Sequence, residues 1–237
     1  MNYRFAIVLT NLLLFSTSLL AQSTRRNSWF RLTVNHRIGQ NFSLDNEFQH
    51  RRQNNFDDKN YLSKALLVSY RSWVHYKPKK DVQVSLSPFA IMHQNPVYEQ
   101  PIDTLKDMGR EIRFAGMAQV QRSLFDMLYV YGKGGMEYRS FKHKKAKLRM
   151  RQRIGLTYSW QICQLNVYEE LMLHVAGVEP TQLLDQNRLG ASISLKPNQP
   201  WALELGYIHT DKLSTSSNTL GTEKNLFLNV SYQLGKN

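Results

Sequence analysis

The regular alternation of polar and apolar residues over long segments constrains this chain more than any other feature. In residues 147–160 every second position from Lys147 to Arg153 is basic, and the positions between them are mostly apolar. In residues 224–234 one face carries Leu, Val and Tyr, and the other carries Phe, Asn, Ser and Gln. Successive side chains of a β-strand point to opposite faces, so a period of two predicts strands. The chain is therefore expected to be all-β.

Eleven segments show this alternation. Each has ten or more residues, which exceeds the five or six residues usual in globular sheets and suits a tilted strand that crosses a bilayer. The predicted strands are 29–38, 42–52, 62–76, 81–92, 110–123, 127–140, 147–160, 164–174, 186–196, 201–210 and 224–234.

The lengths of the connections favour a membrane barrel over a soluble one. Period two alone fits both, since a soluble barrel turns its apolar face inward and a membrane barrel turns it to lipid. Short periplasmic turns that alternate with longer external loops are typical of outer-membrane barrels. Short links are expected at Gly39–Asn41, Lys77–Lys80, Leu124–Asp126, Gln161–Cys163 and Pro197–Pro200. Longer links are expected at Gln53–Tyr61, His93–Gly109, Phe141–Ala146, Val175–Asp185 and Asp211–Glu223.

Aromatic residues near the predicted strand ends point the same way, because amphipathic rings settle at the level of the lipid headgroups. These are Trp29, Trp73, Tyr76, Tyr158, Trp160, Trp201 and Tyr232. We therefore predict a closed antiparallel transmembrane β-barrel of roughly 10 to 12 strands. Bacterial barrels normally have an even number of strands, so we expect a twelfth strand near the N-terminus or within residues 93–110.

The N-terminal segment is predicted to direct export. Arg4 is followed by the mostly apolar run Phe5–Leu20, and Ala21 supplies the small residue of a cleavage site. Residues 1–21 are therefore expected to be a signal peptide and residues 22–237 the barrel. This predicts location in the bacterial cell outer membrane, contact with outer-membrane lipid and lipopolysaccharide, and insertion by the barrel-assembly machinery.

The formal net charge of +13 would suit an acidic partner. Export argues against nucleic acid as that partner. Cys163 is the single cysteine, which excludes an intramolecular disulfide and a multi-cysteine zinc site. No metal site and no cofactor are expected.

If the apolar face meets lipid, the opposite face lines the lumen and places many charges there. Such charges must pair in a narrow, poorly solvated interior, so we expect a Glu–Arg network across the strands. Two interpretations stay open: a polar plug that holds the barrel together, or an anion-selective path or acidic-glycan site. The predicted lumen residues are Glu47, Arg51, Glu111, Arg113, Glu137, Arg139, Arg149, Arg151, Arg153, Glu170, Arg188 and Glu204.

No catalytic motif is found in the sequence. The chain has neither the Gly-x-Ser-x-Gly elbow nor His-Glu-x-x-His. Its seven histidines are scattered, although His93, His174 and His209 fall near the longer links, where barrel enzymes place their sites. The sequence therefore favours a barrel that is not an enzyme.

Several short motifs resemble the bacterial family known as domain of unknown function 2490. The motifs are Glu111-Ile112-Arg113, Glu137-Tyr138-Arg139, Arg151-Gln152-Arg153, Tyr168-Glu169-Glu170, Asp185-Gln186-Asn187-Arg188-Leu189 and Gly206-Tyr207. The resemblance implies an exported outer-membrane barrel without an established activity. It also implies that Glu111, Arg113, Glu137, Arg139, Glu170, Asn187 and Arg188 matter to the barrel. The C-terminus departs from many barrels, since Gly235-Lys236-Asn237 replaces a final aromatic residue.

Three functional hypotheses follow. The first is a structural outer-membrane barrel or small pore with a charged Glu/Arg lumen. The second is a barrel enzyme that modifies lipid or lipopolysaccharide, which predicts a His or Ser near a long loop in contact with a carboxylate. The third is a soluble periplasmic, lipocalin-like binding barrel, which predicts that Leu226, Leu228 and Val230 point inward.

Overall fold

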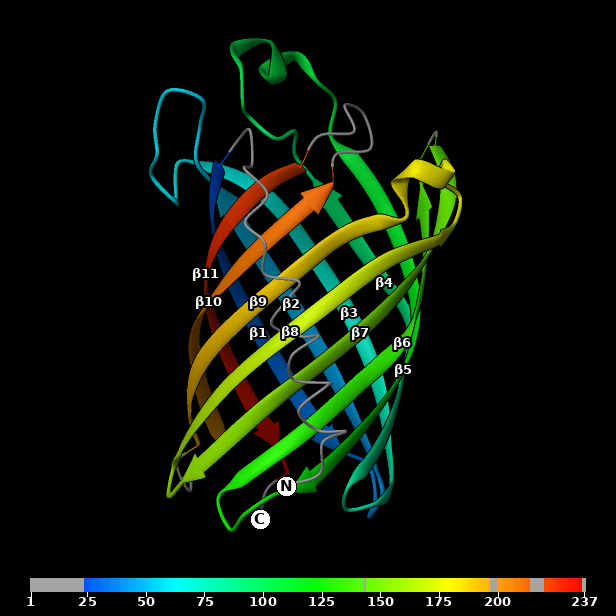
Figure 1. The fold of residues 1–237 in the computed structure, drawn as a ribbon, viewed down its shortest axis with the longest axis vertical. Coiled ribbons are helices and arrows are strands. Elements are labelled where there is room, and N and C mark those ends of the chain that lie inside the picture. The colour runs from blue at the N-terminus through cyan, green and yellow to red at the C-terminus, as the bar shows by residue number, and fades with distance from the viewer. Residues whose placement is uncertain (1–23, 143, 197–199, 214–219, 236–237) are drawn as a thin grey trace, which may run out of the picture.

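Eleven β-strands join edge to edge into one closed barrel in the computed structural model (Figure 1). The structure describes residues 24–142, 144–196, 200–213 and 220–235, so the predicted signal peptide lies outside the described residues. The all-β barrel expected from the sequence is confirmed. The strands are β1 (Thr24–Arg37), β2 (Phe42–Gln53), β3 (Lys64–Lys79), β4 (Val82–Gln94), β5 (Gly109–Ser123), β6 (Leu128–Phe141), β7 (Lys144–Trp160), β8 (Cys163–Ala176), β9 (Leu184–Leu195), β10 (Trp201–Leu213) and β11 (Leu220–Leu234).

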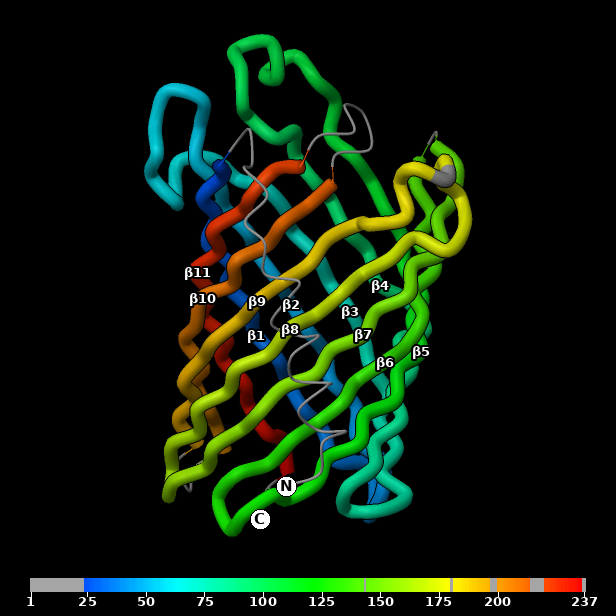
Figure 2. The backbone as a smooth tube through the Cα atoms, in the orientation of Figure 1, coloured from blue at the N-terminus to red at the C-terminus, as the bar shows by residue number. Residues whose placement is uncertain are grey.

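The barrel closes through a parallel pairing of its first and last strands. β1 pairs with β11 from Thr24↔Thr222 to His36↔Leu234, and every other neighbouring pair is antiparallel. A parallel seam lets an odd number of strands close, so the expectation of a twelfth strand is wrong for the described residues. The segment 93–110 holds a short 3-10 helix, η1 (Pro101–Leu105), instead. Consequently β1 starts at one rim and β11 ends at the other (Figure 2).

The connections at the two rims differ in length. The rim that we call the loop rim carries the links 54–63, 95–108 and 177–183, the last with η2 (Pro180–Gln182). The opposite rim, the turn rim, carries the links 38–41, 80–81, 124–127, 161–162 and 196–200. The predicted long link at Phe141–Ala146 is wrong, because β7 begins at Lys144 and that residue already pairs with Phe141.

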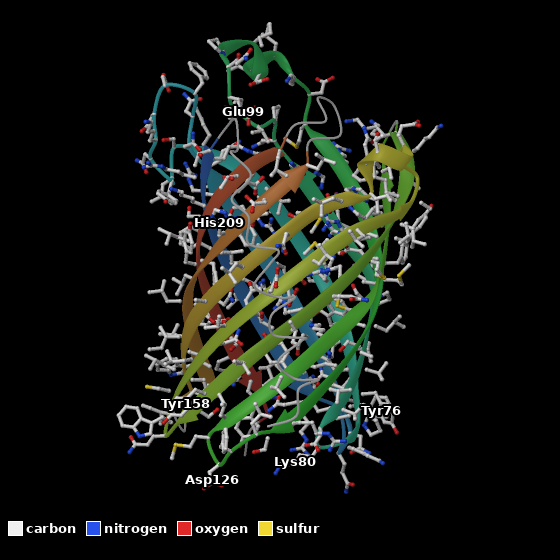
Figure 3. The ribbon with its side chains drawn as sticks, viewed as in Figure 1. Tyr76, Lys80, Glu99, Asp126, Tyr158 and His209 are labelled. Carbon is white, nitrogen blue, oxygen red and sulfur yellow. The ribbon has the colours of Figure 1, made fainter. Side chains whose placement is uncertain are left out.

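The outer wall is apolar. On β11, β10 and β9 the outward residues Leu226, Leu205 and Ile193 are 45%, 58% and 43% exposed. The alternate positions on the same strands face the lumen, where Asn225 and Ser192 are buried. This arrangement is the reverse of the one that the soluble binding-barrel hypothesis predicts, and it contradicts that hypothesis. Figure 3 shows side chains that project from the wall along its whole height.

A girdle of aromatic side chains encircles the outer wall near the turn rim. Tyr76 and Tyr158 lie there (Figure 3) and are 39% and 44% exposed. Trp201 pairs across strands with Tyr232, and both are more than two-fifths exposed. Two aromatic residues predicted for this girdle, Trp29 and Trp73, are placed differently: both are buried and line the lumen. That prediction is wrong because, in the alternating pattern of β1 and β3, both residues occupy positions whose side chains point into the barrel.

Small apolar clusters and flat-lying rings fill part of the interior. Trp29, Tyr168, Ile208 and Phe227 form the cluster that matters for the site. Tyr168 lies flat against β9 over Gly190, where an added Cβ would sit 2.4 Å from the ring. A ring over a glycine on the next strand is a recurrent way to cover exposed sheet backbone. Among the described residues, no helix is long and apolar enough to span a membrane.

Candidate functional site in the barrel lumen

The lumen holds a cavity of about 540 Å³ with strongly charged walls. Its lining runs from Gln94 and Lys212 near the loop rim to Lys77 and Gln83 near the turn rim. Thirteen Arg or Lys residues line it against five Asp or Glu residues. The cations are Arg25, Arg31, Arg51, Arg71, Lys77, Arg113, Lys133, Arg139, Arg149, Arg151, Arg153, Arg188 and Lys212; the anions are Asp45, Glu47, Asp185, Glu204 and Glu223.

Glu137 on β6 is the most deeply buried carboxylate, and its side chain has no solvent exposure. Its Oε1 accepts a hydrogen bond of 2.8 Å from Nη2 of Arg71 on β3. Its Oε2 accepts from Nε of Arg149 on β7 at 3.1 Å, and Arg113 on β5 approaches to 3.8 Å. One carboxylate thus ties together four strands, which fits the expectation that buried charges are paired.

Six lumen side chains form a closed ring of ion pairs. Arg149 also binds Asp185 on β9, whose carboxylate lies 3.8 Å from Arg139. Arg139 and Arg113 both donate to Glu111, with Nε–Oε1 distances of 2.5 and 2.6 Å. The ring therefore alternates acid and base around the wall from β5 to β9. We call this set the acid–base ring; it comprises Glu111, Arg113, Glu137, Arg149, Asp185 and Arg139.

A second cluster surrounds Glu170 on β8. Its carboxylate is 3% exposed and contacts three arginines. Arg151 lies 2.7 Å away, Arg153 3.2 Å and Arg188 3.4 Å. The cluster is thus rich in positive charge, with one carboxylate shared among three guanidinium groups.

In the part of the lumen that the structure describes, the remaining predicted lumen residues form no ion pair with either cluster. Glu47 is 3.6 Å from Arg31 and accepts a hydrogen bond of 3.3 Å from Nε1 of Trp73. Glu204 accepts from Ser192 and Asn229, each at 2.7 Å, with no cation among the described residues within 4.0 Å. Arg51 also has no described carboxylate partner; its guanidinium stacks on Trp29, 3.8 Å from the ring centre.

Sequence reasoning missed several lumen charges. Arg71 lies two residues from Trp73 on β3, and Lys133 lies four residues from Glu137 on β6, so each points to the same side of its strand as that residue. The period of two could therefore have identified both as lumen residues. Arg25 and Glu223 lie in β1 and β11, but the strands predicted there, 29–38 and 224–234, begin after these residues. The sequence pattern predicts Asp185 at the end of a long link, but the register shift between Met172 and Leu173 turns it into the lumen beside Gln186.

Asn187, which the family resemblance singled out, lies on the outer face rather than in the lumen. Its Nδ2 donates to Oε1 of Glu169 at 3.0 Å. The two residues sit on neighbouring strands, β9 and β8, within a wall that is mostly apolar. Each thus satisfies part of the other's hydrogen-bonding capacity in that wall.

The contact that the enzyme hypothesis predicts does occur near a long loop. Nε2 of His174 lies 3.4 Å from Oδ1 of Asp185. His174 is 2% exposed, and its Nδ1 has no hydrogen-bond partner among the described residues, so no hydroxyl or thiol is poised there as a nucleophile. No group of three or more His, Cys, Asp or Glu residues suited to a metal gathers in the part of the chain that the structure describes.

Comparison with known proteins gives one match. The profile of a family described as "Protein of unknown function (DUF2490)" matches residues 26–220. That range contains both lumen clusters and nine complete strands, β2 to β10. None of the curated proteins matches the chain.

Proposed function

This chain belongs to the DUF2490 family of proteins of unknown function, and from that premise we propose that it is an outer-membrane β-barrel that forms a narrow, anion-preferring pore. The observation that carries the proposal is the reversed polarity of the barrel. Apolar side chains cover the outside and ion pairs fill the inside. Such a wall is costly in water but suits hydrocarbon.

Two further features support membrane insertion. The strands have 12 to 17 residues, more than the roughly 9 to 11 that cross a bilayer. The aromatic girdle near the turn rim matches the rings that anchor barrels at an interface. In this proposal the outer wall contacts lipid and lipopolysaccharide, the barrel-assembly machinery inserts it after export by residues 1–21, and the loop rim faces outward.

We predict that the protein fractionates with outer membranes and is released by detergent. Orientation is tested in a Cys163→Ser background with single cysteines at Asp57 in the 54–63 link and Asp126 in the 124–127 turn. A membrane-impermeant maleimide should label Asp57→Cys in intact cells and Asp126→Cys after the outer membrane is permeabilised. Recovery in the soluble periplasmic fraction would contradict the proposal, and the reverse labelling would invert the orientation.

The excess of lumen cations favours passage of anions. Three further lumen carboxylates do not line the cavity: Glu111, Glu137 and Glu170. When they are added to the five that do, the thirteen cations still outnumber the carboxylates, so the lumen is positive. A positive path attracts anions and repels cations.

We therefore expect discrete conductance steps in planar bilayers and a greater permeability to chloride than to potassium in a KCl gradient. Detergent without protein is the control. Absence of steps from correctly folded protein would instead support the polar-plug interpretation, and a preference for potassium would contradict anion selectivity.

A further inference from the structure

We propose that the lumen contains a binding site for a small phosphate-type oxyanion, built from the cavity-lining residues Trp29, Gln49, Arg51, Lys133, Arg153 and Arg188. The site deepens the pore proposal, on which it rests for the route by which a ligand enters. It shares Arg153 and Arg188 with the Glu170 cluster and has no residue in common with the acid–base ring.

The first argument is the distribution of partners among the cavity-lining cations. Ten of the thirteen have a carboxylate within 4.0 Å, and Arg51, Lys77 and Lys133 have none among the described residues. Lys77 is exposed at the turn rim, where water solvates it. Arg51 and Lys133 are inside the barrel, where an uncompensated charge is unfavourable.

The second argument is mutual repulsion. Arg51 on β2 lies in the positive field of Arg188, Arg113 and Arg31, which the negative charge of Glu223 offsets in part. Lys133 on β6 lies in that of Arg153 and Arg151, which the negative charges of Glu170 on β8 and Glu47 on β2 offset in part. Lys133 and Arg51 line the same cavity. An anion between these side chains would offset the repulsion.

The third argument is that two aromatic rings, Trp29 and Tyr168, lie against the guanidinium groups and orient them. Arg51 and Arg188 both lie over Trp29, 3.8 and 5.3 Å from a ring centre, and Arg153 lies 4.0 Å from the centre of Tyr168. Stacking uses the faces of a guanidinium and leaves its N–H edges free for a ligand.

The fourth argument is a set of buried donors without a protein acceptor. Nε of Arg51, Arg153 and Arg188, Nε1 of Trp29 and Nε2 of Gln49 are all buried and all lack a described partner. Trp29 is only 4% exposed, and Gln49 receives the Nη2 hydrogen bond of Arg51 at 3.0 Å, which places it beside that guanidinium. Every unsatisfied atom in this group is a donor. The complementary ligand is an acceptor with several oxygens and negative charge, which describes a phosphate group.

The test is titration calorimetry of the folded, detergent-solubilised barrel with inorganic phosphate. We expect saturable binding to wild type and an affinity at least about tenfold lower in Arg51→Met and Lys133→Met, because each loses a charge-assisted contact. Neither substitution removes the partner of a carboxylate, so both variants should fold. Lys77→Met is the matched control: it removes the same charge at the turn rim and should change the affinity less than about twofold.

Two comparison ligands and a second measurement make the outcomes decisive. A hexose phosphate should bind like inorganic phosphate, whereas tighter binding of glucuronate would overturn the phosphate assignment. Equal loss of affinity in Lys77→Met, or no binding to folded wild type, would overturn the site. Saturable binding by a barrel that shows no conductance would refute the pore proposal and support the phosphate site. Conductance without phosphate binding would support the pore and refute the site.

Discussion

Glu137→Gln is expected to destabilise the barrel by about 3–5 kcal/mol, the usual cost of removing one partner from a buried ion pair. Glu137 has no solvent exposure and neutralises Arg71 and Arg149 directly. Glutamine keeps the shape but leaves Arg71 without a described carboxylate partner and Arg149 with Asp185 alone, in a lumen already rich in cations. The loss would be measured by equilibrium unfolding with urea in lipid vesicles. The folded fraction at each urea concentration is read from the heat-modifiable migration of the barrel in gels.

Glu204→Gln is the matched control for this change. Glu204 also faces the lumen, but its described partners are the neutral Ser192 and Asn229. Its replacement should cost about 1 kcal/mol, the scale of one hydrogen bond. Adding Arg71→Met to Glu137→Gln should recover part of the stability, because it removes one of the uncompensated charges. Equal stability of Glu137→Gln and Glu204→Gln would show that the acid–base ring does not hold the strands together.

Leu205→Arg is expected to destabilise the barrel in lipid vesicles by about 2–4 kcal/mol, the cost of a cation on the lipid face near mid-bilayer. Leu205 lies in a row of outward apolar residues that includes Leu228 and Phe30, near the middle of β1. It is 58% exposed, so in a water-soluble protein the same change would shift stability by no more than about 0.5 kcal/mol. The substitution therefore separates the two environments.

Ile38→Arg provides the control for depth. Ile38 lies in the 38–41 turn and is 61% exposed, so its side chain belongs at the rim rather than within the apolar band. An arginine near an interface costs about 0–1 kcal/mol. Unfolding curves in vesicles for both variants provide the comparison. A neutral Leu205→Arg would contradict insertion of this wall into a bilayer.

The strands themselves were accessible to sequence reasoning, because alternation is a local property. Residues 42–52 were predicted as a strand and β2 covers Phe42–Gln53; residues 201–210 were predicted and β10 covers Trp201–Leu213. The main error in length was at strand ends, where polar residues such as Arg25 extend a strand beyond its apolar pattern. The family resemblance was confirmed by the match over residues 26–220.

Errors arose where a residue's position depends on its neighbours in space. Trp29 and Trp73 looked like interface anchors because aromatic residues near strand ends often are, but both turn inward. A register shift beside Met172 places both Asp185 and Gln186 in the lumen, and a strict period of two allows only one of them there. The role of the predicted lumen residues in function stays a prediction, which the substitutions above test.

The amino-acid sequence alone determined that this chain forms long β-strands with one apolar and one charged face, since side-chain direction along a strand follows from backbone geometry. Only the tertiary structure decided which charges meet and how the sheet ends. Ion pairs such as Glu137 with Arg71 join residues 66 positions apart, and the parallel seam of β1 with β11 joins the two ends of the barrel. Both depend on the curvature and stagger of the whole wall, which no single segment encodes.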